Sequence, residues 1–278
     1  MPELPEVETT KSGIAPHIQG QKIRQLVIRQ PKLRWPIPDD LPSLIKDQFV
    51  LDVRRRAKYL LIDVGPEKSG LLKGTVIIHL GMSGSLRVVD GNAPMPKKHE
   101  HFDLCFTNDV MLRFTDPRRF GACVWQEAHC ISNLLGHLGP EPLSEDFNSD
   151  YIFQKSRKRT CAIKTFIMDQ KFVVGVGNIY ASESLFLSGI NPKKAAGKVS
   201  KKKYQQLTQC IKEVLAKAIA DGGTTLRDFV GSDGKPGYFA QQLRVYGRAN
   251  EPCLQCETPI KQITQGQRST FYCPKCQK

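Results

Sequence analysis

Long apolar segments are absent from this sequence of 278 residues, and its uninterrupted apolar runs extend over only a few residues. A helix that spans a bilayer needs about 20 apolar residues, so the sequence predicts no membrane-spanning segment. The N-terminus also lacks the basic and apolar stretches of a secretory signal, because acids and prolines occupy it. We therefore expect a protein of the cytoplasm that has no membrane partner.

Acidic residues are scarce relative to basic ones. The chain has 27 Asp and Glu residues against 41 Lys and Arg residues, which gives a formal net charge of +14 and a pI near 9.4. Such an excess favours a polyanion as partner, because each phosphate that the protein neutralises releases condensed counterions. The charge alone leaves open a basic surface that serves only solubility.

Cysteine is not scarce, but its distribution is uneven. The chain contains nine cysteines, and four of them form the pairs Cys253-x-x-Cys256 and Cys273-x-x-Cys276, separated by sixteen residues. The other five are scattered, as in a reduced cytosol: Cys105, Cys123, Cys130, Cys161 and Cys210. The two pairs can surround one Zn²⁺ tetrahedrally, with a β-ribbon between them. We expect a structural zinc, since four thiolates leave no position for an activated water; two disulfides are the alternative.

The region 1–130 is predicted to be a β-sandwich with a helix packed at its start. Residues 101–114 alternate apolar side chains on two strands around Asn108-Asp109, which is typical of a hairpin. The apolar positions on these strands are Phe102, Leu104, Phe106, Val110, Leu112 and Phe114. Val7, Ile14 and Ile18 form one loose helical stripe.

Helical periods dominate after a Gly/Pro-rich linker at 131–143. We expect a helical domain over 144–244, with a helix that begins at Ser144. The clearest helix follows Ser200 as its cap and is ended by Gly222 and Gly223. Its apolar stripe is Tyr204, Leu207, Ile211, Leu215 and Ala218. Residues 245–278 form the four-cysteine zinc finger, which is too short to hold a core without the metal. The predicted fold class is therefore α+β.

Glycines punctuate the turn between two helical segments near residue 175. Gly175 and Gly177 are spaced as in a dinucleotide-binding loop, but the third glycine of that motif is missing, and no organic cofactor is predicted. Asn178 is predicted to cap a helix that starts at Ile179. A clamp on the DNA backbone and a purely structural helical hairpin are equally compatible with this pattern.

Four features, in this order and at this length, resemble bacterial formamidopyrimidine-DNA glycosylases over essentially the whole chain. They are PELPEVE at 2–8, DPRRFG at 116–121, VGVGNIYASE at 174–183 and the terminal four-cysteine ribbon. The resemblance implies an N-terminal two-layer β-sandwich and a C-terminal helical domain with a helix-two-turns-helix motif and a zinc finger. It also implies a monomeric base-excision repair enzyme, a glycosylase and AP lyase for oxidised purines in double-stranded DNA, such as 8-oxoguanine and formamidopyrimidines.

The resemblance places the catalytic chemistry at the start of the chain. Removal of Met1 is expected because the second residue is small, and it leaves Pro2 with a free amine that titrates near pH 8. In this family the amine attacks C1′, expels the base and forms a Schiff base, after which β,δ-elimination cuts the strand. Glu3 is implied to protonate the opening sugar. Glu6 belongs to the same group, although capping the first helical turn explains it equally well.

Two basic residues are implied to act on the phosphates. Lys58 matches the strand lysine that assists β-elimination; without the resemblance, an ordinary surface lysine after Arg54-Arg55-Arg56 would be the preferred interpretation. Arg268 is expected near the tip of the ribbon, after the turn Gln265-Gly266-Gln267, and matches the arginine linked to the second elimination. A ribbon that only braces the fold is the alternative to nucleic-acid contact.

The remaining site residues follow from the same resemblance. A base that is flipped out of the duplex leaves a void, which Met82, Arg118 and Phe120 are implied to fill. Contacts with the DNA backbone or the lesion region are implied for His79, His99, Arg119, Arg159, Lys164 and Asn178. The loop over the flipped base is implied to use Thr224 and Thr225.

Two other functions are weighed against this one. An endonuclease VIII-like glycosylase for oxidised pyrimidines is disfavoured because DPRRFG and the long glycine-rich segment after Gly222 are both present. A non-catalytic DNA-binding protein would require the PELPE start to be incidental.

Overall fold

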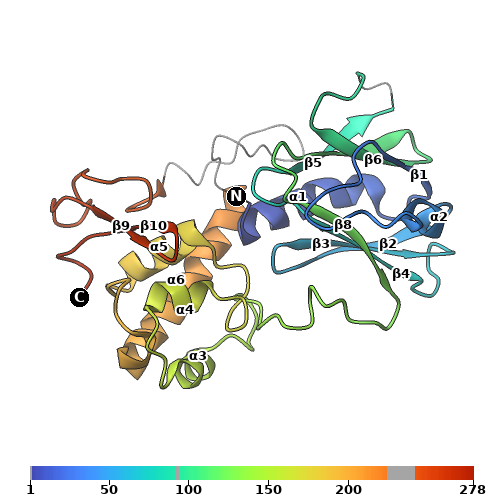
Figure 1. The fold of residues 1–278 in the computed structure, drawn as a ribbon. Coiled ribbons are helices and arrows are strands. Elements are labelled where there is room, and N and C mark those ends of the chain that lie inside the picture. The colour runs from blue at the N-terminus through green and yellow to red at the C-terminus, as the bar shows by residue number, and fades with distance from the viewer. Residues whose placement is uncertain (1, 92–93, 224–241) are drawn as a thin grey trace. The chain divides into compact units, whose positions relative to one another are not determined.

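The computed structural model describes residues 2–91, 94–223 and 242–278 (Figure 1). The chain forms two compact units, one of residues Met1–Gly136 with Gly222–Tyr238 and one of residues His137–Asp221 with Phe239–Lys278. The predicted α+β class is confirmed, since the first unit contains two sheets and the second contains helices and a β-hairpin. Thr224 and Thr225 lie outside the described residues.

The first unit is a sandwich of two four-stranded antiparallel sheets with helix α1 (Leu4–Ile18) packed against both (Figure 1). One sheet has the order β2-β3-β4-β8 and the other β1-β6-β7-β5. The strands are β1 (Ile23–Ile28), β2 (Phe49–Arg56), β3 (Tyr59–Gly65), β4 (Gly74–His79), β5 (Ser85–Asp90), β6 (Glu100–Phe106), β7 (Val110–Thr115) and β8 (Ala122–Glu127). A short helix, α2 (Leu41–Ile45), follows β1.

The core of this unit lies between the sheets and is formed by the alternating side chains predicted from the sequence. The β6–β7 hairpin is confirmed: it directs Phe102 and Phe114 into the core, where their rings stack with centroids 4.8 Å apart. The stripe of α1 is also confirmed, because Val7, Ile14 and Ile18 are all buried in the same cluster. The sandwich is thus a rigid support for the turns that connect its strands.

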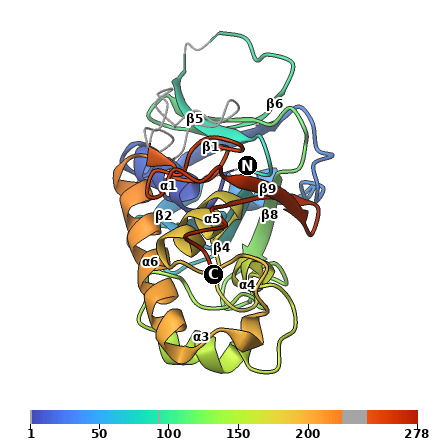
Figure 2. The same cartoon turned by 90° about the vertical axis from the view of Figure 1, so that its left-hand side faces the viewer.

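The second unit contains four α-helices among its described residues: α3 (Ser149–Ser156), α4 (Ile163–Met168), α5 (Asn178–Leu187) and α6 (Lys201–Ala220). A 3₁₀ turn, η1 (Ala196–Lys198), precedes α6. The long helix α6 packs against α3 and α5 (Figure 2). Ser200 caps α6 as predicted, since its side chain accepts from the Lys203 N–H. Within the described ranges, none of the helices has the length and apolarity needed to cross a bilayer.

The predicted helix start at Ser144 is wrong. Helix α3 begins after Asn148, whose side chain accepts from the Tyr151 N–H at 2.9 Å. Ser144 instead donates its hydroxyl to the Glu141 carbonyl in a turn. Both residue types are good helix caps, and burial of Phe147 in the intervening turn places the start four residues later.

The C-terminal ribbon packs on α5 and is part of the second unit. Its strands are β9 (Lys261–Gln265) and β10 (Arg268–Tyr272), and its apolar residues Ile260 and Phe271 share a cluster with Phe186 of α5. The buried carboxylate of Glu183 accepts from three consecutive backbone N–H groups at residues 244–246, at 2.9–3.0 Å. Helix α5 therefore anchors the segment that leads into the ribbon.

Candidate functional site

The first residues of the chain form a buried acidic helix start. Pro2 is buried, and the side chains of Glu3 and Glu6 are each 2% exposed. Glu3 is the N-cap of α1, and its backbone N–H donates to the Glu6 carboxylate at 2.7 Å in a capping box. The structural interpretation of Glu6 is therefore confirmed, while a direct chemical role for it stays a prediction. Gly223, with φ of +84°, lies against Glu6, where an added Cβ would come within 3.1 Å of the carboxylate.

Lys58 lies in the two-residue turn between β2 and β3, beside Ala57 with φ of +54°. It is only 7% exposed, so the interpretation as an ordinary surface lysine is wrong. Its assignment to a strand is also imprecise, since β2 ends at Arg56 and β3 begins at Tyr59. Because the sequence shows only a basic run here, the burial could not be read from it.

His79, at the end of β4, is held as a neutral ring. Burial is the main cause that lowers its pKa to about 4, and the nearby charges of Lys58 and Arg34 lower it further. Its Nδ1 accepts the Gly81 N–H at 2.9 Å, which fixes the ring proton on Nε2. The ring also lies 4.9 Å from that of Tyr59. His79 therefore offers a hydrogen-bond donor of fixed direction and no positive charge.

We expect the His79 imidazole to titrate near pH 4 in the folded protein, against 6.5 in the unfolded chain. Between these values the unfolded chain binds one proton more. The contribution of His79 to the free energy of unfolding is therefore fully present above pH 6.5 and is lost as the pH falls through this window, by about 3 kcal/mol. NMR titration of the ring nitrogens measures the pKa of His79 in the folded protein, and the signal is assigned by its loss in His79→Gln. A midpoint near 6.5 would contradict the structure.

Three of the predicted DNA contacts lie with His79 around one cavity of the first unit. The cavity of about 370 Å³ is lined by Arg34, His79, Gly81, Met82, Arg119 and Phe120. Met82 and Phe120 are 37% and 40% exposed, so a core role for Met82 is excluded. The Arg118 guanidinium lies over the Phe120 ring at 5.0 Å. The structure thus brings the three predicted void fillers, Met82, Arg118 and Phe120, to one surface.

Arg34 is a site residue that the sequence interpretation missed. Its guanidinium lies over the Trp35 ring at 4.6 Å, and within the described residues it makes no ion pair with a carboxylate. The adjacent arginine and tryptophan were the available signal, since basic and aromatic neighbours are common on nucleic-acid surfaces. His99, in contrast, is only partly exposed and lies edge-on to His101, with ring centroids 6.4 Å apart.

In the second unit, α4 and α5 flank the glycine-punctuated turns at 169–177, which matches the predicted pair of helical segments. The predicted capping role of Asn178 is wrong. Gly177 is the N-cap, and Asn178 is the first residue of α5. The Asn178 side chain instead accepts from Lys164 Nζ at 2.6 Å and donates to the Ser269 carbonyl at 3.0 Å.

Lys164 is 2% exposed and joins α4 to the ribbon. Its ammonium group also donates to the Ser269 carbonyl at 3.0 Å and to the Thr270 hydroxyl at 2.8 Å. These hydrogen bonds direct the Lys164 ammonium group toward oxygen atoms of Asn178 and of the ribbon. A direct contact of Lys164 with DNA stays a prediction.

Arg268 is exposed at the tip of the ribbon, as expected. It pairs with Gln265 across a turn in which Gly266 and Gln267 both have positive φ, as in a type I′ hairpin. A cavity of about 310 Å³ next to it is lined by Lys164, Thr165, Met168, Asp169, Gln265, Gly266 and Arg268. Arg159 is exposed elsewhere in the unit, with its guanidinium 5.0 Å from the Phe172 ring centroid.

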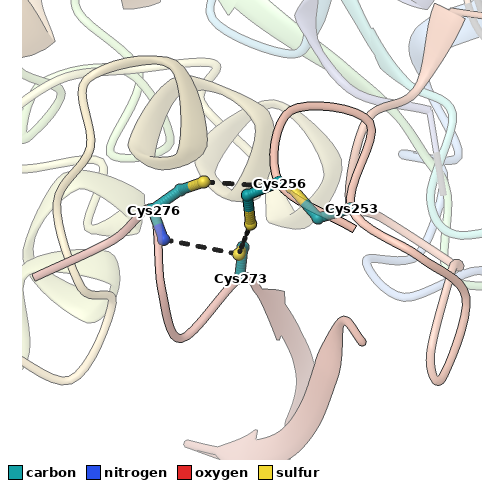
Figure 3. Close-up of side chains that lie close together, drawn as sticks. All are labelled: Cys253, Cys256, Cys273 and Cys276. Atoms are coloured by element: carbon teal, nitrogen blue, oxygen red, sulfur yellow. Dashed lines mark hydrogen bonds between the residues drawn. The ribbon is translucent and has the colours of Figure 1, made fainter. Parts of the chain in front are cut away.

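The four paired cysteines converge on one point (Figure 3). Their sulfur atoms all lie within 4.8 Å of one another; Cys253 and Cys276 are 3.9 Å apart and Cys256 and Cys273 are 3.5 Å apart. A tetrahedral site with Zn–S bonds of about 2.3 Å needs sulfurs about 3.8 Å apart, so the residues fit one structural Zn²⁺. Backbone N–H groups of Gln255 and Cys276 donate to the Cys253 and Cys273 sulfurs. The predicted zinc site is confirmed.

Profiles of three known protein domains match successive parts of the chain. The profile of the formamidopyrimidine-DNA glycosylase N-terminal domain matches residues 1–123, that of the corresponding H2TH domain residues 138–230, and that of the zinc finger found in FPG and IleRS residues 250–278. The formamidopyrimidine-DNA glycosylase of Edwardsiella ictaluri is 55% identical over the full length of both chains.

Solved structures of similar chains include DNA complexes. MutM in complex with DNA that contains carbocyclic 8-oxo-G is 34% identical with a TM-score of 0.89, and both chains are covered completely. Lactococcus lactis FPG (MutM) in complex with DNA that contains an oxidised pyrimidine is 32% identical with a TM-score of 0.88, again over all of both chains.

Proposed function

Since the chain belongs to the formamidopyrimidine-DNA glycosylase family, whose members are DNA repair glycosylases, we propose that it excises oxidised purines from duplex DNA and then cuts the strand as an AP lyase. The observation that carries this proposal is the buried Pro2-Glu3 pair at the start of α1. Once Met1 is removed, the secondary amine of Pro2 and the carboxyl group of Glu3 are next to each other at a buried position. Pro2 and Glu3 thus lie directly before the first turn of α1, with Glu3 as its N-cap.

The proposed reaction begins once Met1 has been removed. The Pro2 nitrogen forms a bond to C1′ as the bond from C1′ to the base breaks, and the base leaves with a proton from solvent. The proton that the Pro2 nitrogen loses passes to Glu3, which donates it to the sugar ring oxygen as the bond from C1′ to that oxygen breaks and the iminium forms. Loss of a C2′ proton then breaks the bond to the 3′ phosphate, and a second elimination breaks the bond to the 5′ phosphate. Water finally hydrolyses the iminium and returns the free amine.

The surface around Met82, Arg118 and Phe120 supports preference for a purine lesion opposite cytosine. The two apolar side chains suit insertion into a base stack, and the guanidinium of Arg118 suits the acceptors on the edge of cytosine. The similar MutM bound to DNA with an 8-oxoguanine analogue agrees with this assignment. The Lactococcus lactis complex with an oxidised pyrimidine favours a second candidate, a broader lesion range.

Excision rates under single-turnover conditions separate the two candidates. We expect 8-oxoguanine opposite cytosine to be removed at least about tenfold faster than 5-hydroxycytosine opposite guanine, a difference of about 1.4 kcal/mol in transition-state stabilisation. Equal rates on the two duplexes would replace the oxidised-purine assignment with the broader one. The cleaved strands are expected to carry phosphate at both ends of the gap, which a gel of end-labelled DNA shows.

Lys58 is proposed to neutralise a DNA phosphate and to assist the first elimination. In Lys58→Gln the slope of log K against log salt is expected to fall by about one unit, because one counterion fewer is released. Strand cleavage is expected to lag behind base release in the same variant. Lys68→Gln, at an exposed lysine of the first unit, is the control, and its slope should stay unchanged. An unchanged slope for Lys58→Gln would remove it from the phosphate contacts.

A further inference from the structure

Asp116, the first residue of the DPRRFG segment, is a fully buried carboxylate that no step of the proposed reaction uses. It is 0% exposed, and no cation of the described residues forms a salt bridge with it. An ionised group buried without a cation is costly unless hydrogen-bond donors surround it. The groups that donate hydrogen bonds to the Asp116 carboxylate therefore identify the segments that it holds in place.

The carboxylate of Asp116 binds both turns that carry the predicted void fillers. One oxygen accepts from the Gly121 N–H at 2.7 Å. The other accepts from the Arg118 N–H at 3.3 Å and from the Ser83 hydroxyl at 3.2 Å. Ser83 follows Met82, and residues 118 and 121 flank Phe120. A single side chain thus connects the Met82 turn to the Arg118–Phe120 loop.

The backbone of Asp116 is fixed as firmly as its side chain. Its N–H donates to the His99 carbonyl at 3.0 Å, and its carbonyl accepts from His101 Nε2 at 2.6 Å and from the Arg119 N–H at 3.2 Å. Residues 99 and 101 flank the start of β6, so the carboxylate is tied to the rigid sandwich. Because Asp116 is hydrogen-bonded both to the start of β6 and to the two turns, it can fix the position of the turns relative to the sheet.

The two turns also pack backbone against backbone, so they cannot shift independently. A Cβ on Gly81 would lie 2.6 Å from both the Gly121 nitrogen and the Phe120 carbonyl carbon. A Cβ on Gly121 would lie 2.6 Å from the Phe114 ring and 2.8 Å from the His79 carbonyl. Contacts this short exclude any side chain, and only glycine permits the close approach.

We propose that Asp116 is a positioning residue that fixes the Met82 turn and the Arg118–Phe120 loop as one unit, and thereby sets the discrimination between bases opposite the lesion. This inference rests on the proposed function, because it needs Arg118 to face the opposite base. Asp116 itself does not touch DNA. Its effect passes through the backbone of Arg118 and through the turn at Ser83.

Asp116→Asn changes the hydrogen bonding with little change in volume. One carboxylate oxygen becomes an NH₂ group. The three groups that donate to Asp116 then face an amide with one acceptor oxygen and one donor nitrogen. If the remaining oxygen keeps the Gly121 N–H, the NH₂ group faces Ser83 and Arg118. The Ser83 hydroxyl can turn and accept, but the Arg118 N–H loses its acceptor. The loop is therefore loosened at the residue that reads the opposite base.

The test is the ratio of single-turnover excision rates for 8-oxoguanine opposite cytosine and opposite adenine. Asp116→Asn is expected to lower this ratio at least about fivefold, the lower end of what one side chain–base contact contributes. Ser83→Ala is expected to lower it about twofold, since one hydrogen bond of the three is lost. Asp109→Asn, in the exposed β6–β7 turn, is the matched control and should leave the ratio unchanged. Cleavage of single-stranded abasic DNA, which has no opposite base, should fall less than about twofold in Asp116→Asn.

Arg118→Ala distinguishes failure of the proposed contact between Arg118 and the opposite base from failure of the positioning role of Asp116. If it leaves the ratio unchanged, Arg118 does not read the opposite base, and its proposed assignment to cytosine fails together with the inference. If it lowers the ratio while folded Asp116→Asn keeps the wild-type value, the inference alone is overturned. Circular dichroism reports whether Asp116→Asn folds. If it does not, Ser83→Ala decides, and an unchanged ratio in that variant overturns the positioning role.

Discussion

Protein that starts at Pro2 is expected to be trapped covalently by borohydride on DNA with 8-oxoguanine opposite cytosine, whereas protein with any residue before Pro2 is not. An amide nitrogen has no available lone pair and cannot form the iminium that borohydride reduces. Excision is expected to fall at least about 10³-fold, because loss of a covalent nucleophile leaves only binding and orientation. Intact mass establishes the N-terminus of each sample, and a denaturing gel measures the adduct.

The matched pair is one protein with a cleavable N-terminal extension, before and after cleavage directly in front of Pro2. The uncleaved form should still bind the duplex, though with some loss because the buried helix start must admit the extension. Glu3→Gln on the cleaved background should reduce excision by about 10²–10⁴-fold, as for loss of a general acid. Full trapping by the uncleaved form would show that another amine of the chain is the nucleophile.

Cys253→Ala is expected to release the zinc and to weaken binding of duplex DNA at least about 100-fold, or about 2.7 kcal/mol. A structural Zn²⁺ supplies most of the folding free energy of a small ribbon, so β9 and β10 lose their order and Arg268 loses its position. Metal analysis gives one zinc per wild-type chain and a substoichiometric amount in the variant. Anisotropy with labelled DNA gives the affinity.

Cys161→Ala provides the comparison, because Cys161 is exposed and does not belong to the metal cluster. It should retain one zinc and the wild-type affinity. A chelator strong enough to remove the metal from wild-type protein should reproduce the effect of Cys253→Ala. Tight DNA binding by zinc-free protein would show that the ribbon is not required for the complex.

The parts of the fold that were predictable are those whose information is local. The alternating strands around Asn108, the stripe of α6 with Ser200 before it, and the four paired cysteines each follow from spacing within about twenty residues. The periodicity of a helix or strand and the spacing of metal ligands are both visible within a segment of this length. The structure confirms the three features that were predicted from them.

The failures concern side chains whose partners are distant in sequence. Asn178 looks like a helix cap, yet its amide is used by Lys164 and by Ser269, 91 residues away. Lys58 follows three arginines, and only the folded β2–β3 turn shows that it is buried. Asp116 stands in a recognisable motif but was assigned no role, because its hydrogen bond to Ser83, 33 residues away, requires the two turns to meet. No local pattern contains these pairings.

The sharing of a core between the ribbon and α5 limits how the ribbon can be exchanged between proteins. Its residues Ile260 and Phe271 are buried against Phe186, and Glu183 binds the backbone just before it. A ribbon of this sequence transplanted alone would expose an apolar face and leave three backbone N–H groups without their acceptor. Recombination that preserves function therefore has to move the ribbon together with α5, or provide an apolar side chain and a carboxylate in the new host.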